Sequence, residues 1–155
     1  MTGHPSLDFV FALHSHLPYV LNHGRWPHGS DWICEAAFDT YLPLLEVLRQ
    51  LGDEDTPAPV TIGFTPVLAN QLASPTFARE MDAFFDQRLT ACAEAPASLA
   101  SSSELHLLPL AEYWRERLTR LRQIFDDMDG NLVGGFRALQ AARRHARLPP
   151  AARAR

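Results

Sequence analysis

LDFVFAL (residues 7–13) is a continuous apolar run of strand length, and it decides the fold class of this chain. Such a run predicts a strand buried on both faces, as in parallel sheets. A second run, VTIGF (60–64), predicts another short buried strand. A strand, a crossover helix and a parallel strand indicate an α/β architecture, with function expected at the carboxyl ends of the strands.

The predicted crossover carries an apolar stripe from Ala37 to Leu51, which is typical of an amphipathic helix. Pro43 falls inside this stripe. It is tolerated if Asp39 or Thr40 caps the helix, because the first turn has no intrahelical donors to lose, and otherwise the helix kinks there.

Further helical patterns follow the second strand. TPVLANQL (65–72) predicts a helix capped by Thr65 with Pro66 at its first position. APASLASSS (95–103) is small and polar and is interpreted as a loop. Three more segments have helical periodicity, namely Phe77–Cys92, Leu107–Met128 and LVGGFRALQAA (132–142).

Composition bounds the class of protein. The 155 residues suffice for one domain, 46% of them are hydrophobic, and no run approaches the roughly 20 apolar residues that span a bilayer. The net charge of −4 gives no overall attraction to nucleic acid or anionic membrane. We expect no secretory signal at the N-terminus. Cys34 and Cys92 lie far apart, which favours free thiols in a reducing cytoplasm.

Residues 11–32, FALHSHLPYVLNHGRWPHGSDW, form a ring-rich segment that contains four histidines, two tryptophans and a tyrosine. A metal pair at His14 and His16 is one interpretation, but no HExxH motif or carboxylate ligand accompanies it. A nucleophile at Ser15 is weaker, because no G-x-S-x-G elbow surrounds it. A third interpretation is that the imidazoles are held by hydrogen bonds in a polar loop.

Sugar binding fits the composition of the ring-rich segment best. Pyranose rings present apolar C–H faces that stack on aromatic side chains, and Tyr19, Trp26 and Trp32 would supply such surfaces with a polar group on each. Neutral imidazoles both donate and accept hydrogen bonds to hydroxyls. Clustered tryptophans are also common in protein cores, so composition alone leaves both interpretations open.

Several ordered motifs carry a resemblance to a known family. VFALHSHLPYVLNHGRWPHGSDWICEAAFDTYLPLLEVL (10–48) resembles the opening of glycoside hydrolase family 57, specifically its α-1,4-glucan branching enzymes. The agreement continues through FTPVLANQLASPTF (64–77), LAEYWRERLTRLRQIF (110–125) and NLVGGFRALQ (131–140). It covers about residues 7–140, and the ordered series is far more specific than any one motif.

The resemblance implies the N-terminal part of an incomplete (β/α)7 barrel, not closed within this chain, that acts on an α-glucan and needs no metal or cofactor. Family members carry out a retaining transfer from an α-1,4 to an α-1,6 position, with a Glu nucleophile and an Asp acid/base. By the same resemblance, His14 would contact the sugar next to the cleaved bond with His16 beside it, and Trp26 and Trp32 would stack on sugar rings.

No catalytic residue is assigned in this chain, because the family's two carboxylates lie on later strands. Most Asp and Glu residues of this chain fall in helical patterns and are expected on solvated helix faces. The exceptions are an acidic turn at 53–55 and Asp8, which lies at the start of the first strand and not at its carboxyl end. We therefore expect an N-terminal branching-enzyme fragment, inactive alone and cytoplasmic. The alternatives are a small glucan-binding or complementing module and a metal-dependent polysaccharide deacetylase-like domain.

Two parts are predicted, a truncated catalytic barrel over 1–140 and a basic tail over 141–155. The last acidic residue is Asp129, and six arginines follow it without compensation. The chain contains no lysine, and the tail AARRHARLPPAARAR is made of residues with GC-rich codons. We interpret the tail as disordered or as the product of a frameshift near residue 141. A basic nucleic-acid arm is a weaker interpretation.

Overall fold

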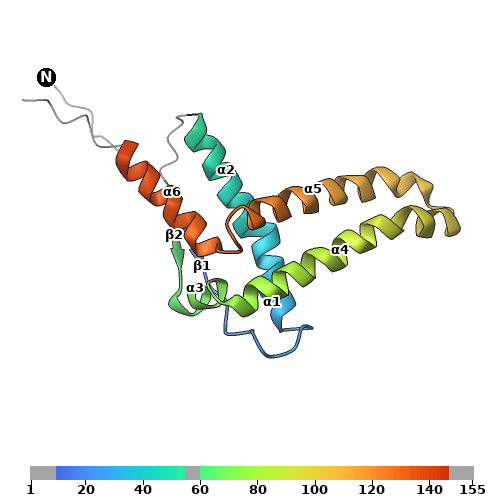
Figure 1. Cartoon of the computed structure of the whole chain (residues 1–155), viewed down its shortest axis with the longest axis horizontal. Coiled ribbons are helices and arrows are strands. Elements are labelled where there is room, and N and C mark those ends of the chain that lie inside the picture. The colour runs from blue at the N-terminus through green and yellow to red at the C-terminus, as the bar shows by residue number, and fades with distance from the viewer. Residues whose placement is uncertain (1–9, 55–59, 147–155) are drawn as a thin grey trace, which may run out of the picture.

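The computed structural model describes residues 10–54 and 60–146, with side chains as far as residue 142. Two strands, β1 (Phe11–Ser15) and β2 (Val60–Phe64), pair in parallel with Phe11 opposite Val60. The chain between them is largely helical, so the predicted α/β architecture with parallel strands is confirmed. In the described part of the chain these two strands make up the whole sheet, and the rest is mostly helix (Figure 1).

The strands are not buried on both faces, which corrects the sequence-based prediction. Phe11 is 50% exposed, and His14 and Thr61 on the opposite face of the sheet are exposed as well. Phe64 packs against Tyr41 and Phe136, so helices cover one face near the end of β2. A strand pair becomes buried on both faces only when further layers cover it, and the described residues supply a layer on one face alone.

The crossover is a continuous run of helical turns in three parts, α1 (Ser30–Ala36), a π-helical turn η1 (Ala37–Tyr41) and α2 (Leu42–Asp53). Pro43 lies in the first turn of α2, but neither Asp39 nor Thr40 caps a helix there. The proline cannot donate to the carbonyl four residues earlier, and its ring crowds that carbonyl. A wider π turn accommodates both effects, so the helix continues through the proline instead of beginning at it.

Helices account for the remainder: α3 (Pro66–Leu72), α4 (Pro75–Ser101), the short 3₁₀ turn η2 (Leu105–Leu107), α5 (Leu108–Asp126) and α6 (Leu132–Ala146). The predicted start of α3 is confirmed, with Thr65 at the N-cap and Pro66 next to it, although the Thr65 hydroxyl makes no capping hydrogen bond. The helical patterns over 77–92, 107–128 and 132–142 are likewise confirmed.

The predicted loop over 95–103 is wrong for most of its length. Residues 95–101 form the last turns of α4, and Pro96 lies inside this helix. Alanine has the highest helix propensity of all residues, and α4 packs along α5, so local composition and tertiary contact together outweigh the hydrogen bond lost at the proline. The two helices form a long arm that extends away from the sheet (Figure 1).

The core lies where α4 and α5 meet the crossover helices. It is rich in aromatic rings: Phe77, Phe85 and Phe125 are fully buried, and Phe85 contacts Phe38 of η1 edge-on at 6.2 Å between centroids. Helix α6 approaches α2 at Gly135, where an added Cβ would lie 3.0 Å from a Leu45 methyl carbon. The core is therefore built by helices, and the strand pair lies at its edge.

Helix α6 continues to Ala146, so residues 141–146 of the predicted tail are helical. Residues 147–155 lie outside the described residues, as do residues 7–9 of the predicted first strand. The boundary at residue 140 stays a prediction.

Candidate functional site

The first part of the site is the carboxyl end of β1. This strand extends to Ser15, so His14 belongs to the strand and not to the loop after it. His14 lies opposite Gly63 of β2, and a Cβ added at Gly63 would lie 3.7 Å from His14 Nδ1. His14 and His16 are both exposed and, within the described residues, neither makes a hydrogen bond or ion pair. The interpretation of hydrogen-bonded imidazoles stays a prediction for these two histidines.

The buried side chain of Gln71 forms hydrogen bonds with the backbone of the segment that follows β1. Gln71 of α3 is 1% exposed, and its Oε1 accepts from the backbone N–H of Val20 at 2.7 Å and of Leu21 at 3.4 Å. Its Nε2 donates to the carbonyl of Pro18 at 2.9 Å. Gln71 is not among the site residues predicted from the sequence. The signal available was a glutamine between Leu68 and Leu72 on the apolar face of a predicted helix.

Two glycines close the second half of the ring-rich segment. Gly24 has a positive φ of +77°, and its carbonyl accepts from Ser30 N–H at 2.9 Å. A Cβ added at Gly29 would lie 1.9 Å from that same carbonyl oxygen, so no larger residue fits without moving the backbone. The closure turns the chain so that Trp26, at its tip, is 77% exposed.

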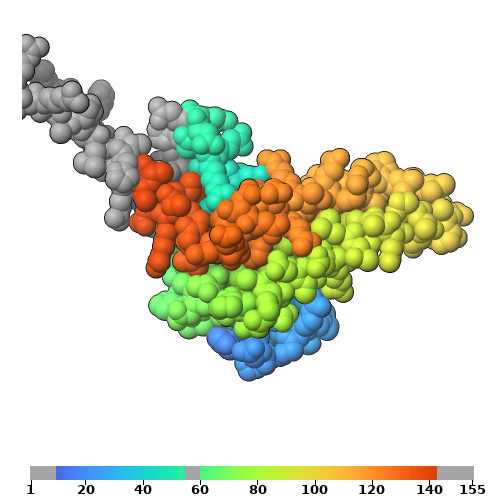
Figure 2. Space-filling model, viewed as in Figure 1, coloured from blue at the N-terminus to red at the C-terminus, as the bar shows by residue number. Residues whose placement is uncertain are grey.

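Polar contacts fasten this closed loop to α4. Arg25 donates to Asp31 at 2.9 Å and to Gln87 of α4 at 3.2 Å. The hydroxyl of the buried Ser30 donates to Glu80 of α4 at 2.8 Å, so Glu80 is not the solvated carboxylate that its helical pattern suggests. In Figure 2 the early, blue part of the chain lies along α4 accordingly. The loop is therefore fixed at several points to a rigid helix.

The rings of the segment form two separate pairs. Trp32, 40% exposed, packs against His28 with 5.7 Å between centroids, and Tyr19 meets His23 edge-on at 6.0 Å. Within the described residues no ring contact joins His14 to either tryptophan. The structure thus places four exposed predicted site residues, His14, His16, Trp26 and Trp32, on one segment without bringing them into contact.

Two groups beneath the segment have shifted pKa values. Burial is the main cause that raises the pKa of the Cys34 thiol to about 12, and the carboxylates of Asp31 and Glu80 raise it further. Arg88 stacks 3.3 Å above the Phe84 ring, and burial lowers the pKa of its guanidinium. Both described cysteines are free thiols, as predicted. Cys34 is a neutral core residue and not a nucleophile.

No cluster of three or more His, Cys, Asp or Glu side chains that could hold a metal ion occurs in the described residues. Carboxylates do gather around Arg122 at the seam of α4 and α5, where Arg122 pairs with Asp86 and, at 3.8 Å, with Asp126. Burial raises the pKa of the nearby Asp82. These groups form an ion-pair network between two helices. No described helix is long and apolar enough to cross a membrane.

Comparison with known proteins supports the motif-based resemblance. A 1,4-alpha-glucan branching enzyme of Thermococcus kodakarensis is 32% identical over 131 residues, which is 84% of this chain and 19% of that enzyme. A crystal structure of a GH57-type branching enzyme from Pyrococcus horikoshii matches with a TM-score of 0.78 and 33% identity, over 85% of this chain and 24% of that one. This chain resembles a segment of a GH57 branching enzyme in both sequence and fold.

A probable 1,4-alpha-glucan branching enzyme of Mycobacterium tuberculosis is 46% identical over 67 residues, which is 43% of this chain and 13% of that protein. No family model matches the chain. The resemblance to GH57 branching enzymes inferred from the motifs is confirmed, and the matched part spans only 19% of the Thermococcus enzyme and 24% of the Pyrococcus one.

Proposed function

We propose that this chain is part of a 1,4-α-glucan branching enzyme and that its ring-rich segment forms one wall of a cleft that binds an α-glucan. The observation that carries the proposal is the exposed Trp26, held on a closed loop that is fastened to α4. Because the backbone that carries Trp26 is already fixed, stacking on a sugar costs the entropy of the side chain alone.

The sheet supports the barrel part of this proposal. One face of the strand pair carries Ala12, His14 and Thr61, which are small or polar and exposed. Such a face suits the interior of a (β/α)7 barrel completed by further strands, with His14 directed toward the sugar next to the cleaved bond and His16 beside it. The functional end of such a barrel is the carboxyl end of its strands, where the ring-rich segment begins.

The 155-residue chain by itself is proposed to be catalytically inactive. Retaining transfer between glucans needs two carboxyl groups roughly 5–5.5 Å apart across the scissile bond. In the described residues, no carboxylate forms a hydrogen bond or ion pair with His14. We expect the purified chain to form no α-1,6 linkages on amylose, measured by the loss of iodine staining and by linkage analysis. New α-1,6 linkages from contaminant-free protein would contradict this.

The binding wall can be tested directly, because the chain has three tryptophans and each indole N–H gives its own NMR signal. Titration with maltoheptaose is expected to shift the signals of Trp26 and Trp32. Trp26→Ala should weaken binding at this site by about fivefold or more, the value of one stacked ring. Absence of any shift at both indoles at millimolar sugar would refute the proposed wall.

A small glucan-binding or complementing module remains the second candidate. It is favoured by one observation, namely that Gln71 of α3 and Glu80 of α4 both hydrogen-bond to the ring-rich segment. Retention on an amylose resin that is lost in Trp32→Ala would support it. The free cysteines and the net charge of −4 support a cytoplasmic protein with no nucleic-acid or membrane partner.

A further inference from the structure

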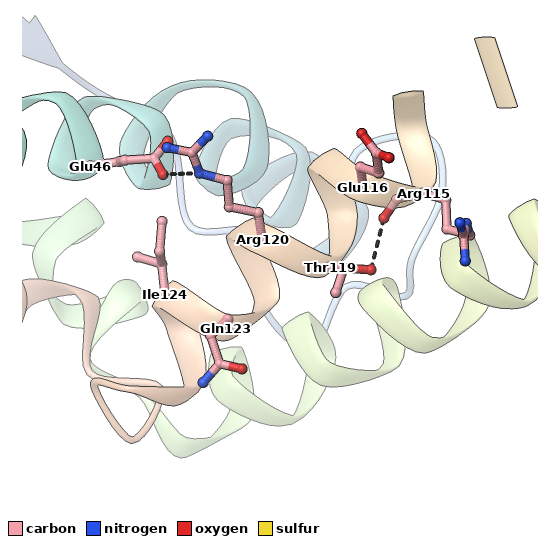
Figure 3. A pocket seen from close by; sticks show the side chains of 7 residues that line it. All are labelled: Glu46, Arg115, Glu116, Thr119, Arg120, Gln123 and Ile124. Atoms are coloured by element: carbon pink, nitrogen blue, oxygen red, sulfur yellow. Dashed lines mark hydrogen bonds and ion pairs between the residues drawn. The ribbon is translucent and has the colours of Figure 1, made fainter. Parts of the chain in front are cut away.

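A shallow groove of about 570 Å³ runs between α2 and α5 and contains no residue of the ring-rich segment. Glu46 comes from α2, and the other lining residues come from successive turns of α5 (Figure 3). The groove therefore belongs to a different surface from the cleft wall described above.

The charges in this groove cancel. Glu46 and Glu116 carry two negative charges, and Arg115 and Arg120 carry two positive ones. Arg120 donates to Glu46 across the groove, and Arg115 pairs with Glu112. A phosphate or a nucleic acid would need guanidinium groups without such partners. Because both arginines are already paired, the lining favours a neutral ligand that can donate to a carboxylate over an anion.

One acceptor in the groove is available to a ligand. Glu116 is exposed and, within the described part of the chain, forms no hydrogen bond or ion pair. No dashed line joins it to another of the lining residues in Figure 3. Donors along the same wall are the N–H groups of Arg115 and Arg120 that their ion pairs leave free, and the Gln123 amide, whose nitrogen also donates to Asp127 at 2.8 Å. Planar side chains with several donors and acceptors suit a ligand that carries many hydroxyls.

An exposed aromatic ring extends this surface by one helical turn. Tyr113 precedes Glu116 by three residues and Arg120 by seven, so the three lie on one face of α5. Tyr113 is 54% exposed, and its ring meets Trp114 edge-on at 5.5 Å between centroids. Trp114 packs in turn against the buried Phe38 at 6.4 Å. Tyr113 is thus held by a neighbour that is itself fixed to the core.

We propose that Tyr113 and the adjacent groove form a second α-glucan-binding surface, separate from the ring-rich segment. A sugar ring stacks on Tyr113, and the hydroxyls of the following sugars bind Glu116 and the donors of the groove. The identity of the ligand rests on the proposed function, whereas the location rests on the neutral polar lining beside an exposed, supported ring.

The indole signals distinguish the two surfaces, because Trp114 touches Tyr113 while Trp26 and Trp32 belong to the ring-rich segment. In the maltoheptaose titration we expect the Trp114 signal to shift as well. Tyr113→Ala should weaken the binding seen at Trp114 by about fivefold or more and leave the binding seen at Trp26 unchanged. Trp26→Ala, the matched control, should weaken the binding seen at Trp32 of the ring-rich segment and leave the binding seen at Trp114 unchanged.

Two results would overturn the second surface: an unmoved Trp114 signal when Trp26 is saturated, or a dissociation constant read at Trp114 that is unchanged in Tyr113→Ala. A shift produced equally by inorganic phosphate would also overturn it, because the groove would then be an anion site. Failure of the proposed function has a different signature, namely silence of Trp26 and Trp32. Unchanged backbone amide signals in Tyr113→Ala verify that the variant is folded.

Discussion

The most informative single substitution is Gln71→Leu, which keeps the size of a buried side chain and removes all of its hydrogen bonds. The N–H of the buried Val20 loses its acceptor at 2.7 Å, and Pro18 loses its donor at 2.9 Å. A buried donor left unsatisfied costs about 1–3 kcal/mol, whereas the exposed Pro18 carbonyl can bind water instead. We expect a total loss of about 2–4 kcal/mol.

Urea denaturation of the 155-residue chain measures this loss. With a slope of about 2 kcal/mol per molar, the middle of the usual range, the midpoint should fall by about 1–2 M. Gln50→Leu is the matched control, because Gln50 is an exposed glutamine near the end of α2. Within the described residues its side chain makes one hydrogen bond, to Glu54 at the C-cap of the same helix. Its effect should stay within about 0.5 kcal/mol. Native-state hydrogen exchange should show lost protection at the Val20 amide in Gln71→Leu alone.

Gln71→Glu separates the acceptor from the donor. An ionised carboxylate still accepts from Val20 but cannot donate to Pro18, whereas the neutral acid can do both. Burial without a cationic partner raises the folded-state pKa of the introduced carboxyl above its unfolded value of about 4.3. The deficit relative to wild type should therefore be small below about pH 4 and grow as pH rises toward neutrality. If Gln71→Leu and Gln50→Leu unfold at the same urea concentration, the hydrogen bonds of Gln71 to the chain after β1 do not stabilise the fold, and this prediction is refuted.

Three further substitutions or modifications test other parts of the structure. Gly29→Ala places a Cβ 1.9 Å from a backbone oxygen and should lower the free energy of unfolding by about 1–3 kcal/mol, measured by heat or urea. Gly52→Ala is the control, because its Cβ would lie in open space, and it should be neutral or slightly stabilising. Equal effects of the two substitutions would contradict the loop closure. Burial raises the pKa of the Cys34 thiol from 9.0 to about 12, so Cys34 should resist alkylation at pH 8 in the native protein while Cys92 reacts first. Because the thiol ionises more easily in the unfolded chain, the free energy of unfolding should fall as pH rises from about 9 to 12. Rapid labelling of Cys34 in the native protein would refute this. Pro96→Ala should raise the free energy of unfolding by about 1–3 kcal/mol, because it removes a proline from the interior of α4, and a loss of stability would show that the proline is needed there.

Local sequence decided much of this structure. The apolar periodicity of residues 107–128 and 132–142 predicted α5 and α6, and Thr65 with Pro66 predicted the start of α3, because these signals depend only on side-chain spacing and on backbone chemistry within one turn. The parallel pairing of β1 and β2 followed from two short apolar runs on either side of a helical stripe. The ordered motifs also revealed the relationship to GH57 branching enzymes.

Tertiary structure alone decided the rest. Whether Phe11 is buried depends on which layers cover the sheet, and no local pattern encodes that. Residues 95–101 became helix because they lie against α5, a contact with a distant segment. Gln71 looked like one more residue of a short helix, yet it holds the backbone at Pro18 and Val20, about 50 residues away in the chain. A hydrogen bond between distant segments leaves no periodicity in either one, so only the folded chain reveals it.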